Sequence, residues 1–176
     1  MPKYLLLDPI QILKGEDHQL ISDAVLISNG YIKAFGEEAR AIGRELNLNS
    51  TSAKEQLIAP CLVDPHSVLE DPLNGKYENL ESLSKKAASS GYGQVALLPK
   101  GLRWRDNPDQ IQKLNASENE VEIHFLGSFS KGGKGKDIAP HADMLQYGAI
   151  GIAEFDSIPS TELLRKGILL NEIGDK

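Results

Sequence analysis

Cysteine is nearly absent from this sequence, since Cys61 is the only one among 176 residues. A single cysteine cannot form an internal disulfide, and it excludes a cysteine metal cluster or redox pair. Long apolar runs are missing too, because the run Leu5 to Leu7 at the amino terminus meets Asp8-Pro9 at once. That run is too short for a signal-peptide core or a membrane span. We therefore expect a cytoplasmic protein without a membrane partner.

An excess of positive charge is also missing. The chain has 19 basic and 25 acidic residues, which gives a formal net charge of -6. Such a balance provides no general attraction to phosphate backbones or anionic lipid, so nucleic acid is not an expected partner. What the chain does have is 40% hydrophobic residues, enough to bury a core in one or two small domains.

Residues 1–56 have the pattern of a small, mostly β domain. Short expected strands are separated by turn residues: Tyr4 to Leu7, Gln11 to Leu13, Ala24 to Ser28 and Tyr31 to Phe35. Asn29-Gly30 tolerates positive φ angles and predicts a tight hairpin between the last two strands. Glu37 to Leu46 has the spacing of an amphipathic helix, with Ala39, Ile42 and Leu46 on one side, and residues 47–52 are expected to form a polar loop.

Residues 57–176 alternate apolar strands with amphipathic helices, a pattern that favours parallel βα units and an α/β fold. The expected strands are Leu57 to Val63, Gln94 to Leu98, Glu122 to Leu126 and Ala149 to Ile152. The expected helices cover residues 79–89, 107–114, 141–147 and 160–170. Four such units make half of a TIM-type barrel, which leaves strand edges uncovered. A missing carboxy-terminal half, a second copy of the chain, or a different open sheet would each resolve this.

One segment carries most of the functional argument. It runs from Leu57 to Pro72 and contains Asp64-Pro65-His66-Ser67-Val68, which places a histidine at the end of an expected buried strand. This segment resembles the first barrel strand of the amidohydrolase superfamily, and within it of dihydroorotases, hydantoinases and allantoinases. That strand typically ends in Asp-x-His-x-His, followed in dihydroorotases by Phe-Arg-Asp-Pro-Gly. Two histidines at this spacing share one face of a strand and can hold the same metal.

The resemblance implies a zinc site and a substrate site, and both are altered here. The first metal histidine is His66, while the second is replaced by Val68, so we expect no bound cofactor and no catalytic residue. The arginine that holds the substrate carboxylate is replaced by Glu70. The substrate-binding asparagine of the second strand is replaced by Lys100. In the fourth strand, Glu154 or Asp156 lies near the position of a bridging metal carboxylate, and Glu154 is the candidate ligand.

The resemblance extends along the chain, in order, over the amino-terminal half of the family. The further similar segments are the hairpin at residues 23–36, the second strand at 96–101, the glycine-rich loop at 130–137 and the fourth strand at 148–156. The later metal histidines and the aspartate that activates water belong to strands that follow these in the family. The water-activating residues are therefore not among those matched.

Three functional hypotheses remain open. The favoured one is a catalytically defective dihydroorotase-like pseudoenzyme that acts as a scaffold or partner in pyrimidine biosynthesis. The resemblance implies aspartate carbamoyltransferase as one partner, and the uncovered strand edges indicate a homo-oligomer or another protein partner. The alternative is a metal-dependent cyclic amide hydrolase, of dihydroorotase or hydantoinase type, that is active only within a larger chain or assembly. The third is a truncated or decaying gene product. Whether the chain is an enzyme is thus left open, although Val68 and Glu70 count against it.

Simpler structural roles compete with these interpretations. His66 without a partner histidine has a structural role more often than a metal-binding one, and capping or surface roles account for His124 and His141. The Lys131 to Lys136 loop lacks the spacing of a phosphate-binding loop, so a solvated loop is expected. Trp104 is either an exposed anchor for a partner or a cap on the barrel edge. Glu70-Asp71 is expected to be hydrated surface charge.

Overall fold

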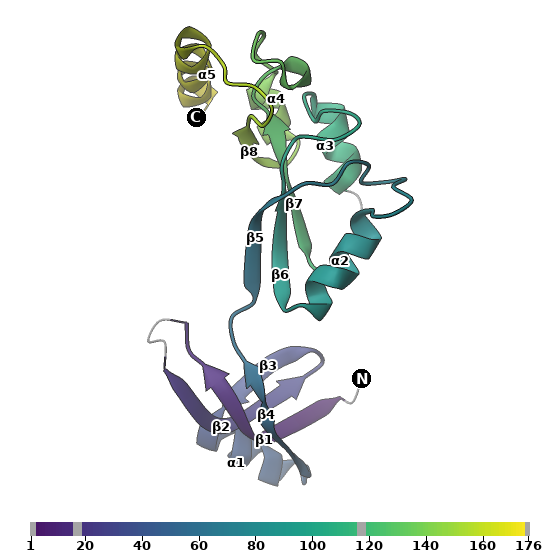
Figure 1. Cartoon of the computed structure of the whole chain (residues 1–176). Coiled ribbons are helices and arrows are strands. Elements are labelled where there is room, and N and C mark those ends of the chain that lie inside the picture. Colours follow the sequence, from purple (N-terminus) through teal and green to yellow (C-terminus); the bar gives the residue numbers. More distant parts are fainter. Residues whose placement is uncertain (1–2, 16–18, 116–118, 175–176) are drawn as a thin grey trace. The chain divides into compact units, whose positions relative to one another are not determined.

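The computed structural model describes residues 3–15, 19–115 and 119–174. The chain divides into two compact units, Met1–Pro60 and Cys61–Lys176, which are described separately below (Figure 1). The sequence placed this division after residue 56, but the strand that contains residue 56 continues to Ile58. The chain therefore leaves the first unit through Ala59 and Pro60.

The amino-terminal unit is a four-stranded sheet with one helix, in the strand order β3-β2-β1-β4. Its elements are β1 (Tyr4–Leu13), β2 (Leu20–Ser28), β3 (Tyr31–Phe35), α1 (Gly36–Glu45) and β4 (Ser50–Ile58). β1 pairs antiparallel with β2 and parallel with β4. Leu6 packs in one apolar cluster with Ala39 of α1, whereas Leu7 belongs to a second cluster with Ile10 and Ile12. Since successive strand residues point to opposite faces, the sheet is apolar on both sides.

The predicted hairpin is confirmed. Asn29 and Gly30 adopt φ angles of 52° and 83°, and β2 pairs with β3 on either side of them. Two predicted strands, Tyr4 to Leu7 and Gln11 to Leu13, are instead one strand, β1, whose pairing is irregular between Leu7 and Ile10. Asp8-Pro9 interrupts the pairing without ending the strand, so reading the proline as a boundary was wrong.

The predicted polar loop at residues 47–52 is right for residues 47–49 and wrong from Ser50, where β4 begins. Its side chains are almost all exposed, and Ala53 is the buried one. The strand is therefore held mainly by backbone pairing to β1 and carries little apolar signal. Leu46, predicted to lie on the buried side of the helix, follows α1 and is exposed.

The second unit consists of four parallel strands, each followed by a helix, which confirms the predicted βα units. Its strands are β5 (Leu62–Ser67), β6 (Tyr92–Leu97), β7 (Glu122–Ser128) and β8 (Ala149–Ala153), in that spatial order. Its helices are α2 (Leu80–Ser89), α3 (Pro108–Asn115), α4 (His141–Gln146) and α5 (Thr161–Gly174), with a 3₁₀ turn η1 (Lys131–Gly133) after β7. The α/β class and the partial barrel topology follow from this order.

The first strand of this unit differs from the prediction. The expected buried strand from Leu57 to Val63 spans the end of β4 and the start of β5, with a break between them. β5 lies at the edge of its sheet, and Val63 is 55% exposed. An edge strand has one neighbour, so apolar residues that a closed barrel would cover remain accessible.

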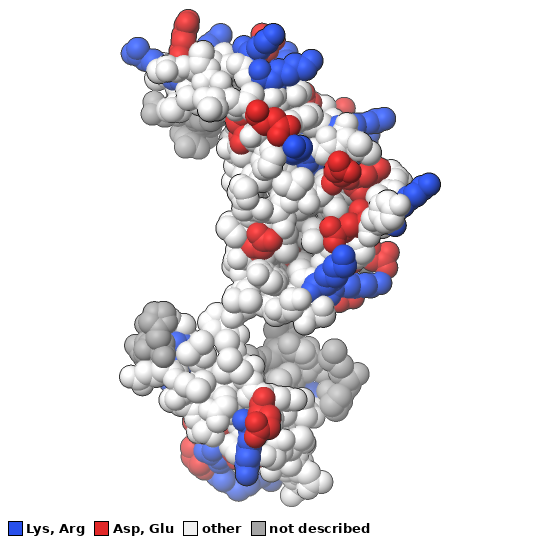
Figure 2. All heavy atoms as spheres, viewed as in Figure 1, with Lys and Arg blue, Asp and Glu red and all other residues white. Residues whose placement is uncertain are grey.

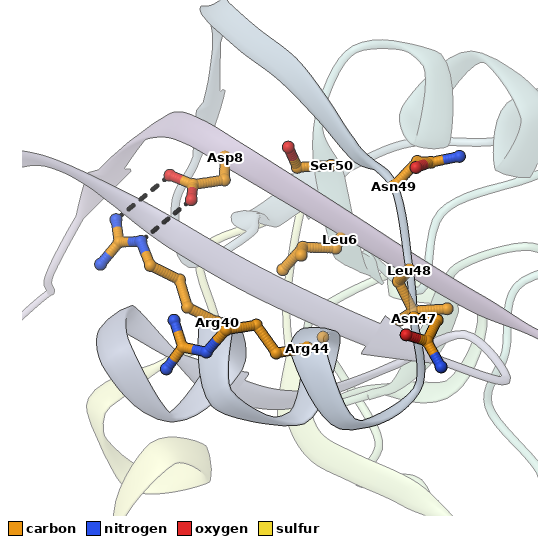
Figure 3. A pocket seen from close by; sticks show the side chains of 9 residues that line it. Leu6, Asp8, Arg40, Arg44, Asn47, Leu48, Asn49 and Ser50 are labelled. Carbon is orange, nitrogen blue, oxygen red and sulfur yellow. Dashed lines mark hydrogen bonds and ion pairs between the residues drawn. The ribbon is translucent and has the colours of Figure 1, made fainter.

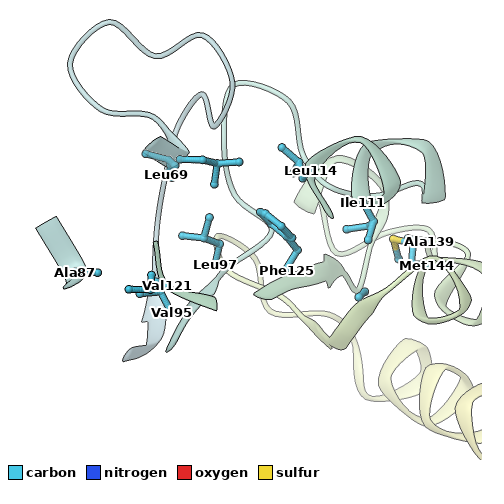
Figure 4. Packing of buried hydrophobic residues seen from close by; sticks show 12 residues of the cluster. Leu69, Ala87, Val95, Leu97, Ile111, Leu114, Val121, Phe125, Ala139 and Met144 are labelled. Atoms are coloured by element: carbon cyan, nitrogen blue, oxygen red, sulfur yellow. The ribbon is translucent and has the colours of Figure 1, made fainter. Parts of the chain in front are cut away.

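A single apolar cluster holds the second unit together (Figure 4). Leu97 of β6 and Phe125 of β7 lie at its centre, and Ile111 of α3 and Met144 of α4 contribute from the helices. Ser84 of α2 is fully buried beside this cluster, where its Oγ accepts hydrogen bonds from the backbone N–H groups of Glu120 (2.6 Å) and Val121 (3.1 Å). Ser84 therefore joins α2 to the chain that enters β7.

The helix starts follow the sequence closely. Asn79 caps α2 in a reciprocal capping box with Ser82, and Asn107 and Ser160 accept hydrogen bonds at the starts of α3 and α5. In α5, the apolar side chains of Leu164 and Ile168 are exposed. The helix packs closely against Phe129 at Gly167, where an added Cβ would lie 2.5 Å from Cε2 of that ring.

Charges of both signs are interspersed on the face of the molecule shown in Figure 2. This mixture agrees with the weakly acidic composition and gives no basic face in that view. Among the described residues, no helix is both long enough and apolar enough to cross a membrane.

Candidate functional site

The carboxyl end of β5 carries His66, the residue predicted to remain from a metal site. Its backbone N–H donates to Oδ1 of Asp64 at 2.9 Å, and Oγ of Ser67 donates to Oδ2 of the same carboxylate at 2.6 Å. The hydrogen bond from Ser67, followed by that from the His66 backbone, lowers the pKa of Asp64 below its usual value. The Asp64 carboxylate thus stabilises the strand end on which His66 stands.

The imidazole of His66 faces an aromatic ring. Its centroid lies 6.4 Å from that of Phe155, which follows β8. Val68, two residues after His66, is 41% exposed and offers no metal-binding atom. Among the side chains that the structure describes, no three from His, Cys, Asp or Glu come together as a metal site would require. The donors present in this part of the chain therefore do not fit a zinc ion.

Lys100, predicted to replace a substrate-binding asparagine, lies in the same region. Its Nζ is 2.9 Å from Oδ1 of Asp156 and 4.8 Å from the ring centroid of Phe155. Both charged side chains are partly exposed, so this ion pair contributes little to stability. Asp156 thus balances the charge of Lys100, which stands where the resemblance predicts an asparagine. His66 and Lys100 therefore meet at Phe155, a contact that sequence reasoning missed because an aromatic residue carries no metal or acid–base signal.

The candidate metal ligand Glu154 is engaged elsewhere. Its carboxylate accepts a hydrogen bond from Oγ of Ser130. The same Ser130 Oγ accepts a hydrogen bond from the backbone N–H of Gly135 at 2.7 Å. Ser130 is fully buried at the start of the glycine-rich loop. Glu154 thus anchors the loop after β7.

That loop also receives Trp104. An added Cβ at Gly133 would lie 2.2 Å from Cη2 of Trp104, so the indole packs directly on the loop backbone. The N–H of Gly132 donates to Oδ2 of Asp106 at 2.8 Å. Trp104 is half-buried against the loop after β7, so it is not a fully exposed anchor. Three lysines of this loop are exposed, as expected for a solvated loop: Lys131, Lys134 and Lys136.

Two further described histidines, His124 and His141, each have contacts of their own. Nε2 of His124 is 3.6 Å from Oε2 of Glu122 on the same strand. His141 is buried at the start of α4, where Nε2 lies 2.7 Å from the carbonyl oxygen of Phe129 and donates to it. The surface role considered for His141 is therefore wrong. Glu70 is exposed, as expected for a hydrated carboxylate.

A separate hollow of about 590 Å³ lies in the amino-terminal unit and contains Arg40 (Figure 3). Nε and Nη2 of Arg40 donate to the two carboxylate oxygens of Asp8 at 2.9 and 3.1 Å, and Nη2 also lies 2.9 Å from Oδ1 of Asp23. The hydrogen bond that Arg40 donates to Asp8 is the largest cause of the raised pKa of Arg40. This guanidinium is matched by carboxylates within its own unit, which argues against an anion site here.

The fold and the position of the site define a class of protein. An amino-terminal β unit followed by parallel βα units, with the candidate residues at the carboxyl ends of the strands, is the arrangement of part of a TIM-type barrel preceded by a β unit. The solved structure of L-hydantoinase from Arthrobacter aurescens has the same fold, with a TM-score of 0.65 over 97% of this chain and 38% of that one, at 14% identity.

Curated relatives confirm the resemblance to dihydroorotases. The chain is 27% identical over 82% of its length to the dihydroorotase of Geobacter metallireducens and 31% identical over 73% to that of Ligilactobacillus salivarius. It is 27% identical over 99% of its length to a dihydroorotase-like protein of Synechocystis. The chain spans 34%, 30% and 43% of these three relatives, respectively. No family model matches the chain.

Proposed function

We propose that this chain is a dihydroorotase-like protein that does not hydrolyse cyclic amides and acts by binding another protein of pyrimidine biosynthesis. Residue 68 is the observation that carries the proposal. Valine has no lone pair to donate, and the single histidine at position 66 faces Phe155. A metal held by imidazoles needs several ligands together, which the first strand of this chain does not supply.

The substrate positions support the same conclusion. Glu70 places a negative charge where the resemblance implies an arginine, and a carboxylate repels the carboxylate of dihydroorotate. Lys100 is paired with Asp156 instead of being free to contact a substrate amide. Both changes lie in the part of the barrel that this chain contains, so later strands would not reverse them.

A role in protein binding is supported by uncovered apolar surface. β5 has one neighbouring strand and exposes Leu62 and Val63, while α5 exposes Ile168 and Leu169. Unpaired strand edges and exposed apolar helix faces are covered in stable assemblies. We propose aspartate carbamoyltransferase or a second copy of the chain as the partner that covers them.

Zinc content and dihydroorotate hydrolysis test the loss of activity. We expect purified wild-type chain to hold substoichiometric zinc and to show no turnover above buffer. Val68→His should bind zinc more tightly than wild type, because it places a second imidazole two residues from His66. The matched control His66→Ala/Val68→His should lose this gain. Stoichiometric zinc together with measurable turnover in the wild-type chain would refute the proposal.

Light scattering, alone and with aspartate carbamoyltransferase, tests the partner. We expect either a homo-oligomer or a complex whose mass includes both proteins. A charged substitution on the exposed face, Ile168→Glu, should weaken that assembly, while Lys166→Glu on the same helix is the control for added charge. A monomer that stays monomeric in the presence of the carbamoyltransferase would contradict the partner proposal without affecting the zinc result.

A second candidate function is a metal-dependent cyclic amide hydrolase that is active within a larger chain or assembly. The observation in its favour is the identity of 27–31% to proteins named dihydroorotase. Adding the carboxy-terminal part of a related dihydroorotase separates the two candidates. Turnover of that fusion would favour the hydrolase, and its absence with a folded fusion would favour the pseudoenzyme.

A further inference from the structure

Arg105 is the most deeply buried charged side chain that the structure describes. It lies after β6 and is 2% exposed, and its backbone is fixed by hydrogen bonds from its N–H to the Pro99 carbonyl (3.0 Å) and from the Ser128 N–H to its own carbonyl (2.6 Å). Its Nη2 donates to the carbonyl oxygen of Lys100 at 3.2 Å. The guanidinium is therefore held in place by the core of the second unit.

This guanidinium has no carboxylate partner in the described part of the chain. Its Nε has no hydrogen-bond partner there, and burial alone lowers the pKa of Arg105 to about 10. At neutral pH the side chain is still charged. Arg40 in the first unit is the contrast, since two aspartates face it. A buried charge without a partner destabilises the folded state. Such groups are found at functional sites, where a bound ligand of opposite charge can supply the partner.

Arg105 lines a pocket of about 400 Å³ in the second unit. Apolar side chains from the loop after β5, from the loop after β6 and from α3 form part of the wall: Pro72, Leu73, Leu102 and Leu114. A volume of this size lies at the small end of the range for ligand pockets, and an apolar wall with one buried charge is their usual composition.

The other charges of the pocket limit what it can accept. Arg103 and Lys113 add two positive charges to that of Arg105, and Glu70 and Asp71 bring two negative charges. The carboxylate of Asp71 already accepts a hydrogen bond from the Asn74 N–H at 3.0 Å. The lining thus carries one net positive charge, which matches a monoanion better than a doubly charged phosphate.

We propose that this pocket binds a small organic monocarboxylate, with the carboxylate on the Arg105 guanidinium and the apolar part against Leu102 and Leu114. Guanidinium and carboxylate form charge-assisted hydrogen bonds that gain strength where water is excluded. The pocket lining includes Glu70, which stands at a predicted substrate position, but none of His66, Lys100 and Phe155. The proposal does not depend on the loss of hydrolytic activity.

Benzoate and its neutral isostere benzamide test the proposal by titration calorimetry on the whole chain. We expect benzoate to bind at least about tenfold more tightly than benzamide, because one charge-assisted hydrogen bond contributes that much. Arg105→Met should abolish this preference. Lys136→Gln, at an exposed position outside the pocket lining, is the matched control and should change benzoate affinity by less than about threefold.

A second variant keeps the test decisive if Arg105→Met does not fold. Leu102 is 72% exposed, so Leu102→Glu should leave the core intact while its charge repels benzoate and not benzamide. Equal affinities for benzoate and benzamide, or a preference that both variants retain, would overturn the proposal. Inorganic phosphate is the third probe, and binding as tight as that of benzoate would overturn the monocarboxylate class.

Discussion

Replacing Ser84 by alanine should lower the free energy of unfolding of the second unit, because it leaves a buried backbone donor without an acceptor. The Ser84 Oγ is the acceptor for the N–H groups of Glu120 and Val121, at 2.6 and 3.1 Å, and the N–H of Val121 is buried. A buried donor left without an acceptor costs about 1–3 kcal/mol. Water can replace part of the bond to Glu120, which is exposed, and alanine gains about 0.5 kcal/mol in helix propensity. The expected net loss is about 2 kcal/mol.

Urea unfolding followed by tryptophan fluorescence measures this loss in the correct unit, because Trp104 is the only tryptophan and lies in the second unit. With a typical slope of about 2 kcal/mol per molar urea, the midpoint should fall by about 1 M. Ser89→Ala is the matched control, since Ser89 is an exposed serine of the same helix. If Ser84→Ala lowers the midpoint no more than Ser89→Ala does, the hydrogen bonds of Ser84 do not stabilise the unit and the reasoning fails.

Three further predictions concern local features of the second unit. Asn79→Ala removes the capping box of α2 and should cost about 0.5–2 kcal/mol by the same urea assay; no change would contradict the cap. Gly133→Ala should destabilise the unit and alter the fluorescence of Trp104, because the residue has φ 64° and the indole occupies the space of the new methyl; an unchanged spectrum would contradict that packing. Since hydrogen bonds lower the pKa of Asp64 in the folded state, its contribution is present above the ordinary carboxyl pKa of about 4 and is lost as pH falls through the folded value. Ser67→Ala should therefore reduce stability more at pH 7 than at pH 3, and an equal reduction at both would refute this assignment.

The sequence predicted the elements whose signals are local. The Asn29-Gly30 hairpin, the helices that begin near residues 79 and 107 and the order of the βα units were all predicted, because turn chemistry and apolar periodicity act over a few residues. β4 was missed because an exposed strand paired mainly through its backbone has no such periodicity. The edge position of β5 was missed because burial depends on which strands are neighbours, and a sequence pattern does not contain that information.

The sequence predicted which residues belong to the candidate site, but not which residues they contact. Resemblance singled out His66, Lys100 and Glu154 individually. Their partners lie on loops that are far apart in sequence and close in space. Lys100, for example, pairs with Asp156, which is 56 residues later. The sequence gives no sign that Arg105 is buried, because an arginine in a polar stretch beside Trp104 and Asp106 is usually solvated. Only the fold shows that it is buried.

The pairing of β1 with β4 has a consequence for the order in which the chain acquires structure during synthesis. Leu6 pairs with Ser50 and Ile12 with Ile58, so the two strands are adjacent in space although more than forty residues separate them. The β2–β3 hairpin can form as soon as Phe35 has left the ribosome, but the amino-terminal sheet cannot be completed until Ile58 has emerged. Until then β1 presents an open backbone edge, and the last strand of the unit is also the segment that leads directly into the second unit.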